Sequence, residues 1–369
     1  MKKIISLLLV VVLILGAVSI FAACSRTYEI ALITDVGNID DKSFNEGAWN
    51  GVKQFAEENN ISYAYYRPKE DTTESRSTTI RDAIAKGAKI IVCPGYMFQD
   101  SIYALQGEFP EIDFLFLDGE PNDNDYTHED GSPIYRTDPN VHCILYKEDQ
   151  AGYFAGYAAV KDGYRKLGFM GGMAVPAVIR FGHGYIQGAE DAAKELGLAD
   201  NAVEIKFTYV GSFGPTDDIK TKASGWYTSG TEVIFACGGG IYLSITAAAA
   251  EANKDVIGVD VDQFAATKNQ TFITSAMKGL TETTMQALEA YYDNEKEWPE
   301  DRAGKTFNLG VNEDAVGLPK TEASWRFDNF TVEEYNGLYA KMVNGTVVVN
   351  VSSIEGELPT VTKVKVIVD

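Results

Sequence analysis

Short apolar runs alternate with helix-length amphipathic stretches along most of the chain. The first series predicts strands at 29–34, 62–67, 89–94, 113–118 and 142–146, with helices at 44–59, 75–87, 100–109 and 151–162. The second predicts strands at 166–170, 204–210, 232–236, 256–260 and 271–275, with helices at 185–196, 217–229 and 241–252. Such alternation is typical of right-handed βαβ units and parallel sheets. The pattern predicts an α/β fold class with two similar, doubly wound, Rossmann-like lobes.

Three further segments complete this picture. The stretch 121–139 is polar and rich in Asp, Asn, Gly and Pro, which predicts an exposed loop. One more helix is expected from Thr281 to about Lys296, followed by polar turns. Alternating valines after Gly345 predict late strands at a sheet edge. The total of 369 residues agrees with two domains, since a domain has roughly 100–200 residues.

Acidic side chains outnumber basic ones by 53 to 32, which gives a formal net charge of -21 at pH 7. This field repels a phosphate backbone and therefore excludes nucleic-acid polymers as partners. Hydrophobic residues make up 45% of the chain, which is ordinary globular usage and allows a substantial core. Small ligands remain compatible with both properties.

Met1 is followed by two lysines and by an uncharged, mostly apolar run over residues 4–23. This arrangement is typical of a signal peptide, although the run is also long enough to remain as a membrane-spanning helix. Phe21-Ala22-Ala23-Cys24 resembles a bacterial lipobox, with Phe in place of the usual Leu. We therefore expect a signal peptide over 1–23, lipidation of Cys24, a linker over 24–28, and a globular part on the extracytoplasmic face of the cell membrane.

The remaining cysteines and the histidines give no sign of a metal site. Three cysteines lie in or beside apolar runs and are expected to be buried free thiols: Cys93, Cys143 and Cys237. The three histidines lack zinc-ligand spacing. Nucleophile-elbow, Walker A and His-Glu-x-x-His motifs are also missing from the sequence. We expect neither a cofactor nor enzymatic activity.

Candidate binding residues follow the ends of the predicted strands, where parallel α/β folds bind ligands. They are Asp35, Gly95, Gly171, Gly172, Phe213, Gly238, Gly239, Gly240, Asp260 and Asp262. The glycine triplet could hold a phosphate at a helix N-terminus, but it lacks the spacing of a dinucleotide-binding loop. Asp260 and Asp262, at the end of the predicted strand 256–260, could bind a cation, act as an acid/base pair, or hydrogen-bond a polyol. A polyol is the most economical interpretation, because no further carboxylates lie at ligand spacing for a cation.

The segment TDVGNIDDKSFNEGAW, residues 34–49, resembles the basic membrane protein (PnrA-like) family. These are lipid-anchored, purine-nucleoside-binding proteins of ABC transporters. Matching motifs follow in order: KEDQAGYFAG at 147–156, GFMGGM and Pro at 168–176, RF, GY and Gly at 180–188, GSF at 211–213, and IGVDVDQ at 257–263. The resemblance extends from Glu29 to about Leu318.

The resemblance implies a type I periplasmic-binding-protein fold, in which a hinge lets the lobes close on a nucleoside. One lobe would comprise 29–163 and 280–308, and the other 164–279 and 309–369. Phe44 and Phe213 would stack on the two faces of the base. Asn45, with Asp149 or Glu148, would bind base edges.

The resemblance further implies that Asp260, Asp35 and Lys278 hold the ribose hydroxyls and that Gly239 offers backbone groups. Structural roles remain open for several of these residues. Phe44 could pack in the core at a helix start, Asp149 could interact with a helix dipole, and Lys278 could be a surface lysine near the hinge.

The expected ligand is inosine, guanosine or adenosine. The expected partners are an ABC permease with its ATPase, and the protein itself is expected to be a monomer. Alternatives are a sugar-binding protein of the same fold and a sensory or adhesive surface lipoprotein. An extracytoplasmic nucleoside hydrolase has less support, because no dense aspartate cluster precedes the first predicted helix.

Overall fold

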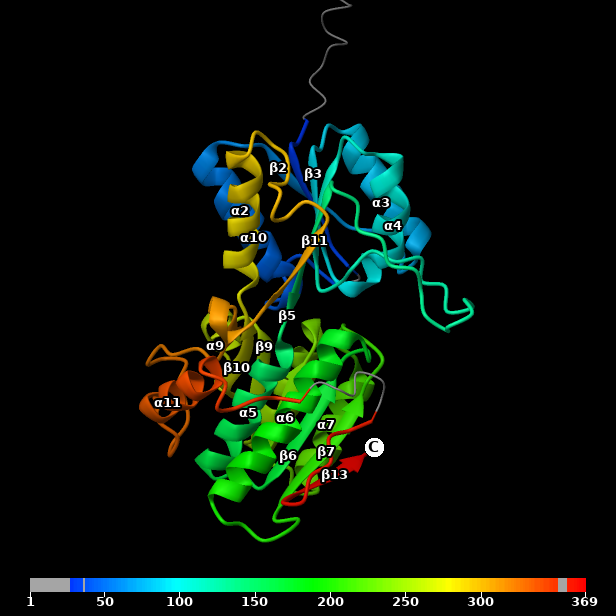
Figure 1. Ribbon diagram of the computed structural model, residues 1–369. Coiled ribbons are helices and arrows are strands. Elements are labelled where there is room, and N and C mark those ends of the chain that lie inside the picture. Colours follow the sequence, from blue (N-terminus) through cyan, green and yellow to red (C-terminus); the bar gives the residue numbers. More distant parts are fainter. Residues whose placement is uncertain (1–26, 36, 351–356) are drawn as a thin grey trace, which may run out of the picture.

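The structure is a computed structural model that describes residues 27–35, 37–350 and 357–369. Two α/β lobes are stacked along its long axis (Figure 1). Each contains a sheet with helices on both faces, so the predicted fold class is confirmed. The predicted signal peptide and Cys24 lie outside the described residues.

The first lobe is built on a six-stranded parallel sheet with strand order β11-β5-β4-β3-β1-β2. Its strands are β1 (Ile30–Ile33), β2 (Tyr63–Tyr66), β3 (Ile90–Pro94), β4 (Asp113–Leu117), β5 (Val141–Tyr146) and β11 (Lys305–Leu309). Its helices are α2 (Phe44–Asn59), α3 (Thr73–Ala85), α4 (Gln99–Glu108) and α10 (Leu280–Asp293). Helices α2 and α10 lie on one face of the sheet, and α3 and α4 on the other (Figure 1).

The second lobe has seven strands in the order β12-β10-β9-β8-β6-β7-β13, and only β12 is antiparallel to its neighbour. The strands are β6 (Lys166–Gly171), β7 (Val203–Tyr209), β8 (Val233–Cys237), β9 (Asp255–Asp260), β10 (Phe272–Lys278), β12 (Val316–Gly317) and β13 (Val364–Val368). The helices are α5 (Glu148–Asp162), α6 (Pro176–Glu195), α7 (Asp217–Thr228), α8 (Tyr242–Ala252), α9 (Gln263–Thr267) and α11 (Val332–Val343).

Helix α5 packs against α6 in the second lobe, with the two backbones in close contact. A Cβ atom on Gly152 would lie 2.1 Å from the Phe181 carbonyl oxygen, and one on Gly184 would lie 1.9 Å from the Asp149 carbonyl oxygen. Glycine is therefore required at these positions for the helices to approach so closely. The sequence-based division assigned residues up to 163, and therefore α5, to the first lobe. The packing of α5 against α6 places this helix in the second lobe instead.

The chain crosses between the lobes after β5, after β10 and after β11. Lys278 is the last residue of β10, and Glu148 is the first residue of α5. Both charged residues therefore lie at crossovers, where the two lobes meet.

Several elements differ from the sequence-based expectations. Strand β11 and helix α11 occur where polar turns were expected. In the described part of the tail, residues 345–350 and 357–369, β13 is the one strand that forms, and it pairs with β7 at the sheet edge. Helix α6 begins at Pro176 rather than at Tyr185, since glycines within it weaken the helical pattern of the sequence. The predicted loop at 121–139 is largely exposed and projects from the first lobe (Figure 1).

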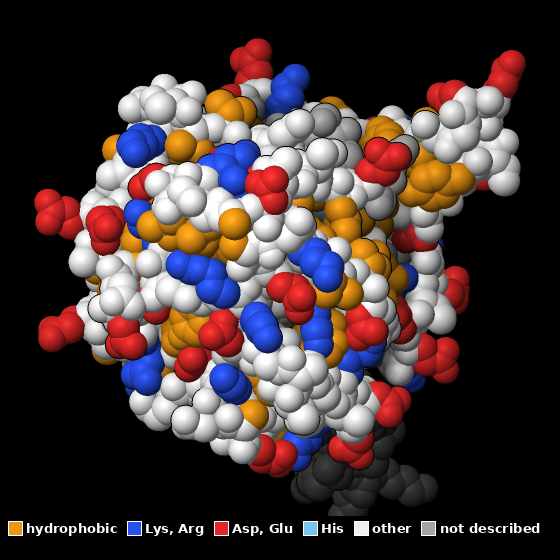
Figure 2. Space-filling view, turned by 90° about the horizontal axis from the view of Figure 1, so that it is seen from below, with side chains coloured by type: hydrophobic (Ala, Val, Ile, Leu, Met, Phe, Trp, Pro, Cys, Tyr) orange, Lys and Arg blue, Asp and Glu red, His pale blue; other side chains and the backbone are white. Residues whose placement is uncertain are grey.

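The three cysteines of the described chain are buried and free, as predicted. Acidic and basic side chains are interspersed on the face shown in Figure 2. Within the described residues, no helix combines the length and apolar character needed to cross a membrane.

Candidate functional site

A cavity lies between the lobes, at the carboxyl ends of the strands. It encloses about 640 Å³ of empty space, part of which is open to solvent. Seven of the predicted ligand-binding residues line it: Asp35, Phe44, Asn45, Phe213, Gly239, Asp260 and Lys278. The two lobes contribute to the same cavity, as the strand-end rule requires.

Glu148 and Asp149 do not line the cavity, although both are buried at the start of α5. Glu148 accepts a 2.6 Å hydrogen bond at Oε2 from Arg180 Nε, and its Oε1 lies 3.3 Å from Lys278 Nζ. Glu148 therefore does not face the cavity itself but contacts Lys278, which does.

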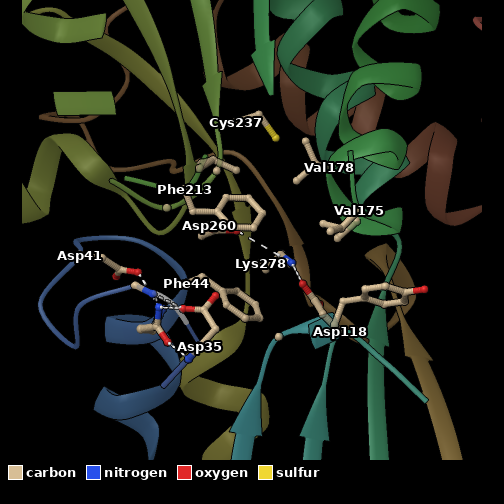
Figure 3. A pocket seen from close by; sticks show the side chains of 18 of the residues that line it. Asp35, Asp41, Phe44, Asp118, Val175, Val178, Phe213, Cys237, Asp260 and Lys278 are labelled. Carbon is tan, nitrogen blue, oxygen red and sulfur yellow. Dashed lines mark hydrogen bonds and ion pairs between the residues drawn. The ribbon is translucent and has the colours of Figure 1, made fainter. Parts of the chain in front are cut away.

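Two phenyl rings from different lobes enter the cavity (Figure 3). Phe44 is the first residue of α2, and Phe213 lies in the loop after β7. The ring of Phe213 rests on backbone: a Cβ on Gly172 would lie 2.4 Å from its Cδ1, and one on Gly238 would lie 3.0 Å away. Gly238 also has a φ of 142°, which side-chain-bearing residues rarely adopt. These two glycines create the space for the ring.

The start of α2 is capped by Asp41. Its Oδ1 accepts hydrogen bonds from the backbone N–H groups of Ser43 and Glu46, at 2.9 and 3.1 Å, and its Oδ2 accepts one from the backbone of Asn45 at 3.1 Å. Burial raises the pKa of Asp41 to about 7. Since Asp41 caps the helix, the hydroxyl of Ser43 is free to donate across the cleft to Asp260 Oδ2, at 2.6 Å.

Asn45 links two carboxylates in the wall of the first lobe. Its Nδ2 donates to Asp35 Oδ1 at 2.8 Å and to Asp41 Oδ2 at 3.1 Å, while its Oδ1 accepts from the Asp35 backbone at 3.3 Å. Asp35 Oδ1 also accepts from the Gly37 backbone at 2.6 Å. Burial raises the pKa of Asp35 despite these bonds. Asn45 therefore orients Asp35, and both of its N–H donors already have partners.

Lys278 lines the cavity and lies among three carboxylates. Its Nζ is hydrogen-bonded to Asp118 Oδ2 and lies 3.3 Å from Glu148 Oε1 and 3.9 Å from Asp260 Oδ1. The ammonium is also 4.7 Å from the centre of the Phe44 ring. Burial alone would lower the pKa of Lys278, but the carboxylates outweigh it and raise the pKa. Lys278 therefore remains a cation with a fixed position.

Two neighbouring carboxyl groups, Glu148 and Asp149, have pKa values that shift in opposite directions. Burial would raise the pKa of Glu148, but Arg180 and Lys278 outweigh that effect and lower it. Burial raises the pKa of Asp149 to about 6, helped by the neighbouring charge of Glu148. Glu148 is therefore a stable anion that holds Lys278 and Arg180, two cations drawn from different elements.

The cavity also has walls that the sequence-based candidates omitted. They include Asp118, Tyr96, Met97, Val175, Val178 and Cys237. Asp118 follows β4, so the strand-end rule could have identified it; Val175 and Val178 lie at the unexpected N-terminal end of α6. Among the described residues, no group of three or more His, Cys, Asp and Glu side chains could hold a metal ion.

Comparisons with known proteins agree on one family. Residues 29–353 match the family model described as ABC transporter substrate-binding protein PnrA-like. The chain is 28% identical to the ABC transporter nucleoside-binding protein BmpA of Lactococcus lactis subsp. cremoris, over 63% of this chain and 64% of that protein. It is 29% identical to basic membrane protein A1 of Borrelia garinii subsp. bavariensis, over 91% of this chain and 94% of that protein.

Solved structures show the same fold. An ABC transporter solute-binding protein from Aeropyrum pernix K1 superposes with a TM-score of 0.71 and 21% identity, covering 88% of this chain and 94% of the other. A solute-binding protein from Conexibacter woesei has a TM-score of 0.64 and 20% identity, covering 88% and 99%. At these low sequence identities, the structural similarity shows a shared fold.

Proposed function

The chain belongs to the PnrA-like family of ABC transporter substrate-binding proteins, and we propose that it binds a purine nucleoside between its lobes. The observation that carries this proposal is the pair of phenyl rings, Phe44 and Phe213, which enter one cavity from opposite lobes. A flat aromatic base between two rings gains roughly 1–3 kcal/mol per base from stacking. The name of the Lactococcus relative, a nucleoside-binding protein, supports the same ligand class.

The polar groups of the cavity suit the rest of a nucleoside. Asp35 and Asp260 offer carboxylate oxygens to the ribose hydroxyls, and such charge-assisted hydrogen bonds are stronger than neutral ones. Lys278 supplies a fixed cation beside Asp260, and Gly239 supplies backbone at the cavity wall. Several carboxylates near the ligand disfavour a phosphate group, so a nucleoside suits the site better than a nucleotide.

Isothermal titration calorimetry with inosine, guanosine and adenosine tests the proposal, and D-ribose and D-galactose serve as comparison ligands. We expect saturable binding of at least one nucleoside and none of either sugar. Tight binding of a sugar without nucleoside binding would instead identify a sugar-binding protein of the same fold.

Phe44→Ala tests the stacking directly. The loss of roughly 1–3 kcal/mol corresponds to a weakening of about 5- to 150-fold. Tyr65→Ala is the matched control, because Tyr65 is an exposed aromatic residue of the same lobe, outside the cavity. Equal nucleoside affinities of the two variants would contradict the assigned role of Phe44.

The transport role extends this proposal. The protein, anchored through a lipid on Cys24 and acting as a monomer, would deliver the nucleoside to an ABC permease and its ATPase. Cys24→Ser should release it from the membrane fraction into the soluble fraction without changing nucleoside affinity. Retention of the variant on membranes would count against the lipid anchor.

A further inference from the structure

A hydrogen-bonded arm, residues 121–135, projects from the first lobe at the level where the two lobes meet (Figure 1). Its two limbs are paired, since Asn122 forms an isolated antiparallel β-bridge with Tyr135. The backbone N–H of Asp123 donates to the Ile134 carbonyl at 3.2 Å, and Asp123 Oδ1 accepts in return from the Ile134 backbone at 2.9 Å. These bonds give the arm a defined shape, so a binding partner does not have to order it first.

The base of the arm is joined to the wall of the ligand cavity. The backbone N–H of Asn122 donates to the Gln99 carbonyl at 3.3 Å, and its side-chain Nδ2 donates to Gln99 Oε1 at 3.1 Å. Gln99 begins α4 directly after a short 3₁₀ helix that contains Tyr96, a residue that lines the cavity. Burial raises the pKa of the Tyr96 hydroxyl, and its contact with Tyr126 of the arm adds to the rise. The arm therefore continues the cavity wall of the first lobe.

Three large apolar side chains of the arm are exposed to solvent. Tyr126, Ile134 and Tyr135 are 55%, 50% and 57% exposed. The other exposed large apolar side chains of the described residues are distributed over both lobes. Clustered exposed apolar groups mark interaction surfaces, and tyrosine is enriched in protein–protein interfaces. The arm thus has the composition of a docking surface.

The charge of the arm restricts the kind of partner. Residues 121–135 contain no lysine or arginine and four acids: Asp123, Asp125, Glu129 and Asp130. Glu129 and Asp130 are exposed. Such an arm repels a second copy of this chain, whose formal net charge is -21, and it repels the anionic headgroups of a membrane. A protein surface that combines apolar groups with lysine or arginine complements it.

We propose that the arm docks onto the extracytoplasmic surface of the permease, on a patch that is both apolar and basic. This inference rests on the proposed transport function, in which the permease receives the nucleoside from the cavity. The permease must approach the cavity to receive it, and the arm adjoins the cavity wall. Ile134 and Tyr135 supply the apolar contacts, while Glu129 and Asp130 supply the complementary charge.

Nucleoside uptake tests the proposal in a deletion strain of the source bacterium that expresses each variant of the full chain. The substrate is the nucleoside that the wild type binds most tightly in calorimetry, in radiolabelled form. In Ile134→Ser/Tyr135→Ser and in Glu129→Lys/Asp130→Lys, uptake at limiting nucleoside should fall at least about fivefold, the scale expected for lost interface anchors. Nucleoside affinity should stay unchanged, because none of these residues lines the cavity.

Matched controls change the same kinds of groups elsewhere on the first lobe. Tyr65→Ser removes an aromatic side chain of 48% exposure from the edge strand β2. Glu58→Lys/Glu111→Lys makes the same change in charge at two exposed positions outside the arm. Both controls should support wild-type uptake. Melting temperatures verify that each variant is folded.

Photo-cross-linking separates this proposal from the choice of ligand. Tyr135→p-benzoylphenylalanine, irradiated in membranes, should form a product with the permease that mass spectrometry identifies, whatever the ligand is. Absence of that product, or a product with a second copy of the chain in its place, overturns the docking role. Failure of every nucleoside to bind, with the permease product present, refutes the proposed ligand and leaves the docking role intact.

The uptake measurements distinguish docking from closure of the cavity. Wild-type uptake by both arm variants overturns the proposal. A loss of nucleoside affinity in Ile134→Ser/Tyr135→Ser that matches the loss of uptake also overturns it, because the arm would then act as a lid on its own cavity. Reduced uptake with unchanged affinity is the result that docking on the permease requires.

Discussion

Ser43 Oγ donates a 2.6 Å hydrogen bond to Asp260 Oδ2, although the two residues lie 217 positions apart in the chain and in different lobes. The donor comes from the start of α2 and the acceptor from the end of β9. Both side chains are buried. This bond joins the two walls of the cleft directly and depends on Asp41, rather than Ser43, capping the helix.

Ser43→Ala should therefore weaken ligand binding by favouring separated lobes. A hydrogen bond to a charged group contributes about 1.5–3 kcal/mol, so nucleoside affinity should fall by roughly tenfold or more. Small-angle X-ray scattering should detect a larger radius of gyration. Ser77→Ala is the matched control, because Ser77 bonds to Ser101 within the first lobe. If the two alanine variants bind nucleosides equally well, the bond across the cleft has no part in closure.

Gly172→Ala should displace the ring of Phe213. The added Cβ would lie 2.4 Å from Phe213 Cδ1, closer than nonbonded carbons can approach, so the ring must move. We expect nucleoside affinity to fall about as far as in Phe213→Ala, which calorimetry can compare directly. Gly225→Ala serves as control, since a Cβ there meets no atom within 4 Å. Wild-type affinity of Gly172→Ala would show that Phe213 does not need its observed position.

His142 should make the protein less stable in mild acid. Burial lowers its pKa from 6.5 to about 4, and its ring packs against Trp298 and Phe307. The unfolded chain therefore takes up this proton below pH 6.5, whereas the folded protein takes it up only near pH 4. The free energy of unfolding should fall across that window by about 3 kcal/mol from this residue.

His142→Phe should lose this part of the pH dependence, as measured by urea unfolding at pH 7 and pH 4.5. Carboxyl groups whose pKa values are raised titrate in both proteins, so the difference between the two isolates His142. The half-buried His128, which is paired with Asp123, provides the control variant His128→Asn. Parallel pH profiles of the wild type and His142→Phe would contradict the prediction.

Glu190 should be needed to hold the C-terminal strand. Its two carboxylate oxygens accept hydrogen bonds from the backbone N–H groups of Thr362, Lys363 and Val364, at 3.1, 2.7 and 3.0 Å. Glu190→Gln replaces one of these acceptors with a donor, and each bond lost to a buried group costs about 1–3 kcal/mol.

Hydrogen exchange should reveal faster exchange over β13 in Glu190→Gln, while nucleoside affinity stays unchanged. Glu251→Gln is the control, because Glu251 pairs with Lys220 on the surface. Unaltered protection of β13 would mean that its pairing with β7 is sufficient to hold it.

The sequence by itself determined the order of the strands up to β10, most of the helices between them, and much of the candidate site. Hydrophobic periodicity is local, so β1 to β10 and the helix Phe44–Asn59 could be predicted from short windows. The strand-end rule located Asp35, Phe213 and Asp260 because parallel strands present their carboxyl ends at one edge. The same rule would also have selected Asp118, which follows β4, although Asp118 was not among the candidates drawn from the sequence.

Only the tertiary structure decided which side chains meet. Lys278 and Asp118 are 160 positions apart, and their pairing depends on how β10 and β4 face each other across the crossovers. Helix α5 joins the second lobe because glycines allow its backbone to contact α6, a fit between surfaces that no single window of sequence contains. The tertiary structure also sets the hydrogen bonds of Asn45 to Asp35 and Asp41, and that of Arg180 to Glu148. The reason is again that hydrogen bonding and burial depend on distances in space.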